Sequence, residues 1–420
     1  IQLITDGKVN VTAWIVLIVG LLLGILYGFL RAKRVQMTDV PQLVSLFNAV
    51  GGGAAAVIGI FDYLTASGHL SLILSIPVFL DVLIGGITFS GSLIATGKLS
   101  GKISGKPVHI PAGPFINIIV ILAILVSAFL MIGQSDNYWY LILALAASLI
   151  FGLLMALPIG GADMPVVVSL LNAFTGLAVA FAGFVIDNQV LIIAGALVGA
   201  AGTILTLQMA DAMNRSVANI LAGGFGTGEG ESSSAGDDAA NAKVVSTSAD
   251  DIGLQLAYAH NVMVVPGYGL AAAQAQHEVA ELAKLLTDHG INVDYAIHPV
   301  AGRMPGHMNV LLADVNVPYD QLKQLDEANS MFGNTDVSLV IGANDVTNPL
   351  ARQSGNSISG MPILDVDKSK SVVVIKRSMS TGYAGVANPL FSLPQTKMFF
   401  ADAKKGLQDI IASTKEYIDQ

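Results

Sequence analysis

Residues 261–272 read Asn261-Val-Met-Val-Val-Pro266-Gly267-Tyr268-Gly269-Leu270-Ala271-Ala272, and they are the strongest indicator of fold class in the chain. A short apolar run indicates a buried strand, and here it passes directly into G-x-G-x-x-A, the turn that joins strand to helix in dinucleotide-binding domains. The two glycines allow a tight turn and the close approach of a pyrophosphate. Gly267, Tyr268, Gly269 and Ala272 are therefore predicted to contact a dinucleotide; the alternative is a turn that is merely tight.

Strand and helix patterns alternate on either side of this stretch. Nearly continuous apolar strands separated by helices predict a doubly wound parallel sheet, a Rossmann-like α/β domain, over residues 256–420. We expect helices at 270–289, 317–332 and 399–414, and further strands at 291–297, 309–315, 337–341 and 371–376, with 362–366 as an additional candidate strand.

The loops at the carboxyl ends of these strands are predicted to converge on one crevice, where open α/β sheets bind ligands. The second strand ends at Ala296-Ile297-His298-Pro299 without the Asp or Glu expected of an NAD site, and Arg303 follows it. Lys376-Arg377-Ser378 ends a later strand. Basic side chains there suit a 2′-phosphate and favour NADP, although each also fits a solvated surface charge. The remaining candidates at strand ends are Gly342, Asn344, Asp345, Gly382 and Tyr383; the last two belong to a glycine-rich segment suited to act as a lid.

Composition separates the first half of the chain from the second. The 420 residues are 53% hydrophobic and 12% charged, against about 25% charged in a typical soluble domain. Residues 1–220 carry eight basic and eight acidic side chains, so the net charge of −9 lies wholly in the second half. This excludes a single soluble domain, a disordered protein and a basic nucleic-acid-binding protein. The lack of cysteine excludes a disulfide scaffold, a thiolate metal site and an iron–sulfur cluster, and no metal is expected.

Seven apolar runs predict a polytopic α-helical membrane bundle over residues 1–220, because about 20 helical residues cross the hydrocarbon core. They cover 13–30, 41–61, 70–97, 114–133, 138–157, 164–186 and 188–210, and only the third contains a charge, Asp81. Seven basic loop residues gather on one side of the bundle, and Lys8 alone lies on the other. The positive-inside rule places the basic side, and everything after residue 211, in the cytoplasm or its organellar equivalent. Residues 221–255, rich in Gly, Ser and acidic residues, are predicted to be a flexible tether, with the glycines at 223–228 as an alternative hinge.

Two spans repeat each other at an offset of 124 residues: 39–49 matches 163–173 at Asp, Pro, Val, Ser, Leu, Asn and Ala. Both copies start on the basic side, so the repeat is parallel, and transporter folds commonly place their sites between such repeats. Asp39 and Asp163 fit either a helix cap or the flank of an ion path. Asn48 and Asn172 lie roughly 10 Å into the bilayer. They fit either a packing hydrogen bond or a polar relay for a proton, and Ser92, in the Gly- and Ser-rich third span, has the same two interpretations.

Taken together, these motifs resemble the beta subunit of the Re/Si-specific, proton-translocating NAD(P) transhydrogenase family. The resemblance rests on Gly267–Gly269, on 298–309, on Gly342–Asp345 and on 376–385, with 160–165 and 213–216 matching its membrane domain, and it covers essentially the whole chain. It implies reversible hydride transfer between NAD(H), bound on an alpha subunit, and NADP(H), bound here, coupled to proton movement. It also implies a homodimer of alpha–beta units in the lipid of a bacterial cytoplasmic or inner organellar membrane, with no nucleic-acid partner. The family's architecture has two further spans before Ile1, so we expect an internal start.

Carried over residue by residue, the resemblance assigns Gly267, Gly269, Arg303, Asp345, Lys376, Arg377 and Tyr383 to NADP(H), and Ser92, Asp163 and Asn172 to coupling. No catalytic side chain is expected beyond bound NADP(H), with Asp345 in support. One departure concerns the proton path: where many bacterial members have a titrating His in the second span, this chain has Asn48, and no His lies in any span. A partner span then supplies the proton carrier, or water alone conducts. The alternative function is a membrane transporter regulated by NADP(H), without hydride transfer.

Overall fold

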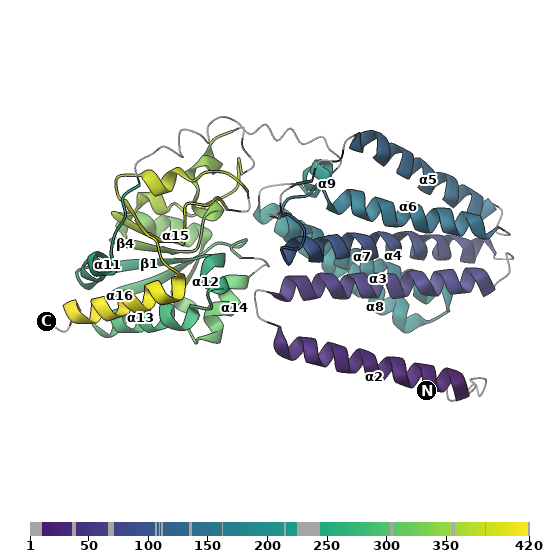
Figure 1. Ribbon diagram of the computed structural model, residues 1–420, viewed down its shortest axis with the longest axis horizontal. Helices are drawn as coiled ribbons and strands as arrows, with labels where there is room; N and C mark the ends of the chain where they lie inside the picture. Colours follow the sequence, from purple (N-terminus) through teal and green to yellow (C-terminus); the bar gives the residue numbers. More distant parts are fainter. Residues whose placement is uncertain are drawn as a thin grey trace.

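A helical bundle and an α/β domain lie side by side along the long axis of the molecule in the computed structural model (Figure 1). The structure describes residues 11–35, 39–65, 71–133 without 106, 109 and 111, 137–213 without 162, 216–224, 244–302, and 306–418 without 355, 357 and 383. The fold class predicted from the sequence, a membrane bundle followed by a doubly wound sheet, is confirmed.

In the part of the chain that the structure describes, the bundle contains seven long apolar helices, each long enough to cross a membrane, and they overlap the seven predicted spans along almost their full length. They are α2 (Val11–Arg34), α3 (Val40–Thr65), α4 (Leu72–Leu99), α5 (Gly113–Gly133), α6 (Tyr138–Ala156), α7 (Met164–Val185) and α8 (Gln189–Ala212), followed by the short α9 (Val217–Gly224).

Glycines set the closest contacts between bundle helices. A Cβ added at Gly176 of α7 would lie 2.8 Å from the carbonyl oxygen of Gly195 in α8, and one added at Gly52 of α3 would lie 2.8 Å from Cβ of Thr88 in α4. Helices that lack side-chain bulk at these positions can bring their backbones together, which is the main source of packing energy in lipid. Helix α2 has no buried residue and lies apart from the other helices (Figure 1).

The α/β domain is built on one parallel sheet of six strands in the order β3-β2-β1-β4-β5-β6. The strands are β1 (Asn261–Pro266), β2 (Asn292–Ile297), β3 (Leu322–Gln324), β4 (Val337–Ile341), β5 (Ser371–Ile375) and β6 (Thr396–Phe399). The α-helices are α11 (Ala249–Ala257), α12 (Tyr268–Ala272), α13 (Gln276–Asp288), α14 (His307–Asp314), α15 (Leu325–Met331) and α16 (Ala403–Ile418). Short 3-10 helices are η2 (Tyr319–Gln321), η3 (Phe332–Asn334), η4 (Asp345–Thr347), η5 (Pro349–Arg352), η6 (Val366–Lys368) and η7 (Pro389–Ser392).

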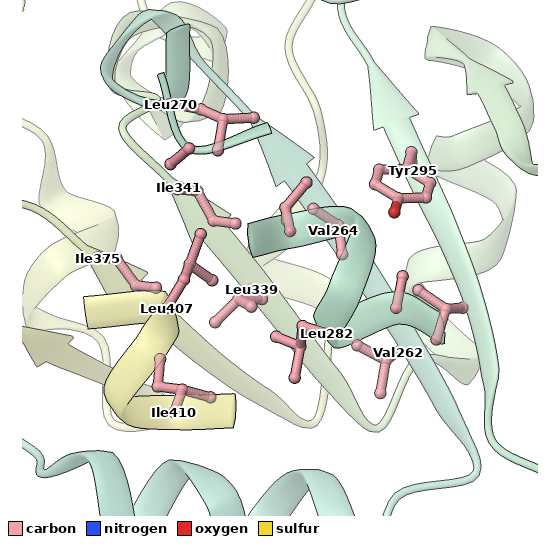
Figure 2. Close-up of a cluster of buried hydrophobic side chains, with 14 of the residues drawn as sticks. Val262, Val264, Leu270, Leu282, Tyr295, Leu339, Ile341, Ile375, Leu407 and Ile410 are labelled. Carbon is pink, nitrogen blue, oxygen red and sulfur yellow. The ribbon is translucent and has the colours of Figure 1, made fainter. Parts of the chain in front are cut away.

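Both faces of this sheet are covered, which explains why its central strands are apolar at nearly every position. On one face, Val264 and Leu339 point toward Leu282 of α13 and Leu407 of α16 (Figure 2). On the other face, a second buried cluster includes Val265, Val340 and Val374 from the strands and Phe332 and Leu390 from the segments that cover them.

Two of the expected elements between β2 and β4 are wrong. Residues 309–315 form helix α14 rather than a strand, and its buried side chains, Met308, Leu311 and Leu312, have helical spacing. Residues 317–332 were expected to form one helix, but they are divided among η2, β3, α15 and η3. The reason is that Leu322–Gln324 pairs with Tyr295–Ile297 of β2 and so becomes the edge strand.

Three further expectations differ from the structure. The expected helix 270–289 is broken into α12 and α13, and Gln274 at the break has a φ of 51°, a left-handed conformation that ends the first helix. Residues 362–366 form no strand, whereas Thr396–Phe399 pairs with β5 as the second edge strand. The last helix consequently starts at Ala403 and not at residue 399.

Helix α11 begins within the residues that we predicted as a tether and ends two residues beyond them, and it packs against α16. Ser248 caps this helix by accepting a hydrogen bond from the Asp251 N–H (3.2 Å), and Ile252 and Leu256 enter the core of the α/β domain. Ser246 forms a parallel bridge with Met398. Most of the expected hinge, including residues 225–228, lies outside the described residues, so the boundaries 1–220, 221–255 and 256–420 remain predictions.

Candidate nucleotide crevice and membrane polar residues

A crevice of about 1090 Å³ lies at the carboxyl ends of the strands. The chain moves from β1 to β2 and β3 on one side and then returns to β4, β5 and β6 on the other, so β1 and β4 are neighbours that lead into opposite halves of the sheet. Parallel sheets bind ligands at this switch point, and the volume is at the top of the range of about 300–1,000 Å³ for small-molecule sites.

The floor of the crevice is a backbone contact between the turn after β1 and the loop after β4. The N–H of Gly267 donates to the carbonyl oxygen of Ile341, and the N–H of Gly269 donates to that of Gly342, both at 2.9 Å. A Cβ at Gly267 would lie 2.5 Å from the Gly342 oxygen, and one at Gly269 would lie 2.6 Å from the Gly342 Cα. Gly342 itself has a φ of +64°. The three glycines are thus required by the contact between these loops, in addition to any approach of a ligand.

Most of the predicted cofactor residues line this crevice. Those in its walls are Gly267, Tyr268, Gly269, Ala272, Gly342, Asn344, Asp345, Lys376, Arg377, Ser378 and Gly382. Arg303 and Tyr383 lie outside the described residues. The grouping brings together residues from three loops that are far apart in the sequence, and their role in binding remains a prediction.

Lys376 is held inside the crevice by several neighbours. Its ammonium group donates to the carbonyl oxygen of Ser380 and lies 4.8 Å from the centre of the Phe391 ring. The side-chain oxygen of Asn344, when it faces Lys376, lies 3.2 Å from Nζ. Burial lowers the pKa of Lys376 below its ordinary value, and the charge of Asp345 acts in the opposite direction. Lys376 therefore fixes the segment that follows β5.

Asp345 connects the loop after β4 to the glycine-rich segment after β5. Its Oδ2 accepts a hydrogen bond from the Ala384 N–H (3.0 Å), and a Cβ at Gly382 would lie 2.6 Å from the same oxygen. Arg377 and Ser378, in contrast, are exposed at the mouth of the crevice. The arrangement leaves the guanidinium group of Arg377 available to an anionic ligand while Lys376 and Asp345 shape the wall.

The residues present fit a dinucleotide phosphate. The contact at Gly267, Gly269 and Gly342 leaves backbone without side chains at the floor, and Arg377 supplies a cation at the rim. Residues 299–302, which follow β2 in the crevice wall, are Pro, Val, Ala and Gly, so no carboxylate is present among them to accept a ribose 2′-hydroxyl.

The membrane bundle forms the opposite wall of the crevice. The wall contains Lys98 and Leu99 from the end of α4, Pro165 from the start of α7, and Gln208 and Met209 from α8. Lys98 is buried, and its ammonium group donates to the carbonyl oxygens of Leu157 and Ile159, the latter at 2.6 Å. The α/β domain also contacts the bundle directly, because Val300 packs against the buried cluster that includes Leu99, Met164 and Met209.

Sequence reasoning missed this role of Lys98, which was assigned only to the basic loops. The signal available was a lysine in the last turn of an apolar span. A cation there can satisfy the terminal carbonyl groups of a neighbouring helix.

His298, at the end of β2, is 1% exposed and joins the β2 loop to the segment before η6. Its Nε2 lies 2.7 Å from the Pro362 carbonyl oxygen, and its Nδ1 accepts a hydrogen bond from the Val300 N–H at 3.2 Å. This pair of contacts requires the neutral tautomer protonated at Nε2. Burial lowers the pKa of His298 to about 4, so the ring is neutral near pH 7 and orders the loop without adding charge.

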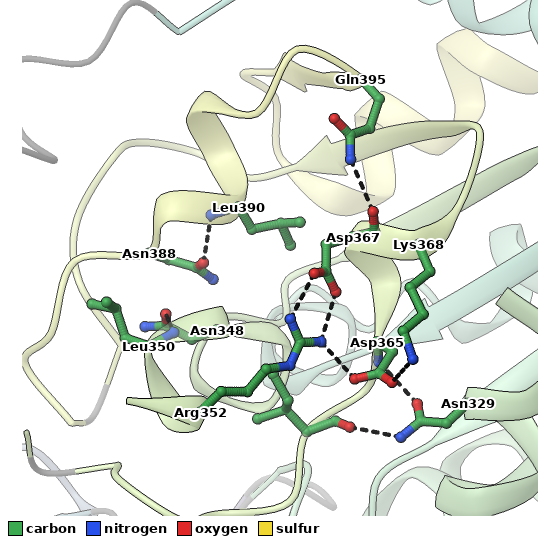
Figure 3. Close-up of polar contacts among 11 residues, drawn as sticks. Asn329, Asn348, Leu350, Arg352, Asp365, Asp367, Lys368, Asn388, Leu390 and Gln395 are labelled. Atoms are coloured by element: carbon green, nitrogen blue, oxygen red, sulfur yellow. Dashed lines mark hydrogen bonds and ion pairs between the residues drawn. The ribbon is translucent and has the colours of Figure 1, made fainter. Parts of the chain in front are cut away.

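An ion cluster around Arg352 fixes the segment between η4 and β5 (Figure 3). The guanidinium group donates to Asp365 (2.6 Å) and, through two hydrogen bonds of 2.6 and 2.8 Å, to Asp367. Lys368 donates to the second oxygen of Asp365 at 2.6 Å. These contacts lie outside the crevice and are structural.

Within the bundle, the structure places Asn48 in the contact between α3 and α7. Asn48 is buried, its Nδ2 donates to the Val168 carbonyl oxygen (3.2 Å), and its own carbonyl oxygen accepts a hydrogen bond from Thr175 (3.3 Å). Ser92 is also buried; its carbonyl oxygen accepts from Ser45 at 2.9 Å, and its hydroxyl has no partner among the described residues. Helix α3 therefore contacts both regions of the predicted path: Asn48 bonds to α7, and Ser45 bonds to Ser92 of α4.

The repeat is not symmetric in its contacts. Asn172, the counterpart of Asn48, is only half-buried on α7. Asp163 lies at the N-cap position of α7 but makes no side-chain cap hydrogen bond, whereas Oδ1 of Asp39 accepts a hydrogen bond from the Gln42 side chain (3.0 Å). The cap interpretation therefore does not account for Asp163.

Comparison with known proteins gives one consistent result. The family model described as NAD(P) transhydrogenase beta subunit matches residues 2–413. Two curated relatives, both named NAD(P) transhydrogenase subunit beta and both from Rhodospirillum rubrum, are each 47% identical over 413 residues, which is 96% of this chain and 88% of the relative. Together with the seven apolar helices, the parallel sheet and the crevice at its switch point, these matches show that the chain belongs to the NAD(P) transhydrogenase beta subunit family.

Proposed function

We propose that this chain binds NADP(H) in the crevice and, together with an alpha subunit that carries NAD(H), catalyses reversible hydride transfer coupled to proton movement across the membrane. The observation that carries the proposal is the composition of the crevice walls. Three strand-end loops with the predicted cofactor residues form one wall, and the ends of α4, α7 and α8 form the other. Events at the nucleotide and in the bundle therefore act on the same cavity.

In this proposal each group of crevice residues has a separate task. Gly267, Gly269 and Gly342 keep the floor free of side chains for the pyrophosphate, and Arg377 binds the 2′-phosphate at the rim. Lys376 and Asp345 hold the segment 380–384 over the site through their contacts with Ser380 and Ala384. When bound, NADP(H) supplies the hydride or accepts it.

The partner and the orientation follow from the sequence. The chain has one G-x-G-x-x-A turn, and hydride transfer needs two nicotinamides in contact, so NAD(H) comes from the alpha subunit. The basic loops place the α/β domain on the cytoplasmic or matrix side. Assembly as a homodimer of alpha–beta units is part of the same expectation.

The proton path is proposed to run near Asn48, Asn172 and Ser92, with Asp163 at its inner mouth. Asn48 and Ser92 are buried in the contacts of α3 with α7 and α4, and Asp163 precedes Pro165 in the crevice wall. Movement of the α/β domain against Lys98 and Pro165 would then change access to the path. Such coupling requires both sites to bias one two-state element.

The test combines the purified chain with a candidate alpha subunit in vesicles and measures hydride exchange between NADH and an NADP analogue together with the internal pH. We expect exchange only with both chains, accompanied by proton uptake. Exchange by the chain alone would contradict the division of the two nucleotide sites. Proton movement that depends on NADP(H) without any exchange would indicate the regulated transporter instead.

A further inference from the structure

A line of small and polar residues follows one face of α4. Asp81, Gly85, Thr88 and Ser92 are spaced by four, three and four residues, which places them on the same side of a helix. This side contacts α3: the Ser92 carbonyl oxygen accepts from Ser45. A Cβ added at Gly59 would lie 2.9 Å from Oδ2 of Asp81. Asp81 thus shares its contact surface with the predicted path residue Ser92.

Asp81 is completely buried; the backbone of Gly59 faces its carboxyl group, and neither carboxyl oxygen makes a hydrogen bond of normal geometry among the described residues. Its neighbours in sequence, Val78, Phe79 and Val82, belong to an apolar cluster with Leu141 of α6. A buried carboxylate without a cationic partner is costly, and an ionisable group inside a span is by default a candidate for a functional site.

The titratable groups around this half of the bundle offer no compensating cation. The described ones are Asp62 and Tyr63 on α3, Tyr138 and Tyr140 on α6, and Asp187 after α7. Tyr63 donates to the Asn137 carbonyl oxygen at 3.3 Å. No Lys, Arg or His is present among the described residues of this half, so a negative charge on Asp81 would have no ionic partner there.

Depth separates Asp81 from the other path residues. Asp81 is nine residues from the start of α4, roughly 14 Å, on the side opposite the basic loops, whereas Ser92 is seven residues from the other end, roughly 10 Å. Asn48, Asn172 and Asp163 all belong to the half that starts at the basic side. The outer half therefore contains Asp81 and none of the predicted path residues.

We propose that Asp81 is the titrating proton carrier of the outer half of the path, an inference that rests on the proposed function. The carboxylate accepts a proton from hydronium on the outer side: one O–H bond of hydronium breaks, leaving water, and one O–H bond forms on the carboxyl group. That bond breaks when the proton passes to water in the inner half, which restores the carboxylate; no electrons are transferred. The amide and hydroxyl side chains of Asn48, Asn172 and Ser92 do not bind and release a proton in this way. Asp81 therefore provides the one titrating group of the path in each chain.

A close helix contact separates Asp81 from the inner half in this structure. A Cβ at Gly85 would lie 2.5 Å from the Gly52 carbonyl oxygen and 2.9 Å from Cβ of Ala56. This contact lies between Asp81 and Thr88 along α4, where the backbones of α3 and α4 meet without side chains between them. Proton release to the inner side therefore requires α3 and α4 to separate at Gly52 and Gly85, which is the step that the nucleotide domain would control.

The experiment compares the wild type with Asp81→Asn, Asp81→Glu and Asp187→Asn, each with the alpha subunit in vesicles. Asp187→Asn is the matched control because it makes the same chemical change at an exposed site at the outer end of α7. Hydride exchange, proton uptake, NADP binding and the infrared carbonyl band of a protonated carboxylic acid are measured on the same samples across pH.

We expect Asp81→Asn to bind NADP normally but to lower proton uptake about 10²-fold, as for loss of a positioned proton-transfer group. Its titrating carboxylic acid band should also disappear. Asp81→Glu should recover proton uptake, and Asp187→Asn should match the wild type. If Asp81 has only a structural role, the folded Asn variant should take up protons at the wild-type rate, and it should keep every carboxylic acid band whose intensity changes with pH; that result would overturn the inference. A wild type that moves no protons would contradict the proposed function, and the band would still decide whether Asp81 titrates.

Discussion

Replacement of Arg377 by alanine should reduce the affinity for NADP and leave that for NAD nearly unchanged. The two cations after β5 are not equivalent, because Lys376 is engaged with Ser380 and Phe391 whereas Arg377 is exposed at the crevice mouth and makes no hydrogen bond among the described residues. The guanidinium group can therefore bind a 2′-phosphate without breaking an existing contact. NAD lacks this phosphate, so the loss should be selective.

The magnitude follows from one charge-assisted contact. Hydrogen bonds to charged groups contribute about 1.5–3 kcal/mol, and the exposure of Arg377 places the expected loss at the lower end, about 10- to 30-fold in affinity. Arg377→Lys should lose part of this, because an ammonium group cannot form the bidentate contact.

Calorimetric titration of the full chain in detergent, with NADP and with NAD at one salt concentration, measures the effect. Lys415→Ala is a suitable control, because Lys415 is an exposed cation of α16 that does not line the crevice and that pairs, among the described residues, with Glu281 of α13. An equal loss of affinity for both nucleotides, or no loss for NADP, would refute the assignment of Arg377 to the 2′-phosphate.

Four other perturbations test the remaining parts of the structure. Gly267→Ala should destabilise the α/β domain by about 1–3 kcal/mol, because the new methyl group meets the Gly342 backbone; thermal unfolding measures this, and an unchanged midpoint would show that the loops can separate freely. The free energy of unfolding should fall as pH decreases from about 6.5 to about 4, by up to about 1.4 kcal/mol per pH unit, because the unfolded chain protonates His298 at its ordinary pKa while burial holds the folded pKa near 4. Denaturant titrations at several pH values measure this dependence. If His298→Asn shows the same loss of stability with falling pH, His298 is not its cause. Arg352→Met should cost about 1–3 kcal/mol by leaving Asp365 and Asp367 without their partner, with a smaller loss at high salt; equal stability at low salt would contradict a structural role. Asn172→Leu should lower proton uptake in vesicles containing the alpha subunit without weakening NADP binding, and an unchanged rate of proton uptake together with an unchanged proton-to-hydride ratio would make Asn172 a packing residue.

The elements predicted correctly are those whose signal is local. A membrane span needs only a run of apolar residues long enough to cross the bilayer, so all seven were predictable. The central strands β1, β4 and β5 are buried on both faces, and their apolar runs could be recognised without knowledge of their neighbours. The glycines of the fingerprint were equally visible, because each satisfies a backbone requirement that other residues cannot meet.

The elements that failed depend on contacts between distant segments. Leu322–Gln324 has no strand pattern of its own and becomes β3 only because Tyr295–Ile297 offers an open edge, and β6 depends in the same way on β5. Helix α14 was mistaken for a strand because a short apolar run does not distinguish a period of two from one of 3.6.

The sequence by itself determined the two-part architecture, the convergence of the strand-end loops on one crevice and the strand-end motifs in its α/β wall, since motif spacing and hydrophobic length are properties of the chain alone. Only the tertiary structure decided that the crevice is closed by Lys98 and the inner ends of the bundle helices, and that Asp81 is buried against Gly59 with no cationic partner among the described residues. The role of a buried ionisable residue depends on the groups that it contacts, and those groups belong to helices that are distant in sequence. That is the physical reason why a single Asp in an apolar span could be counted in the sequence but interpreted only in the fold.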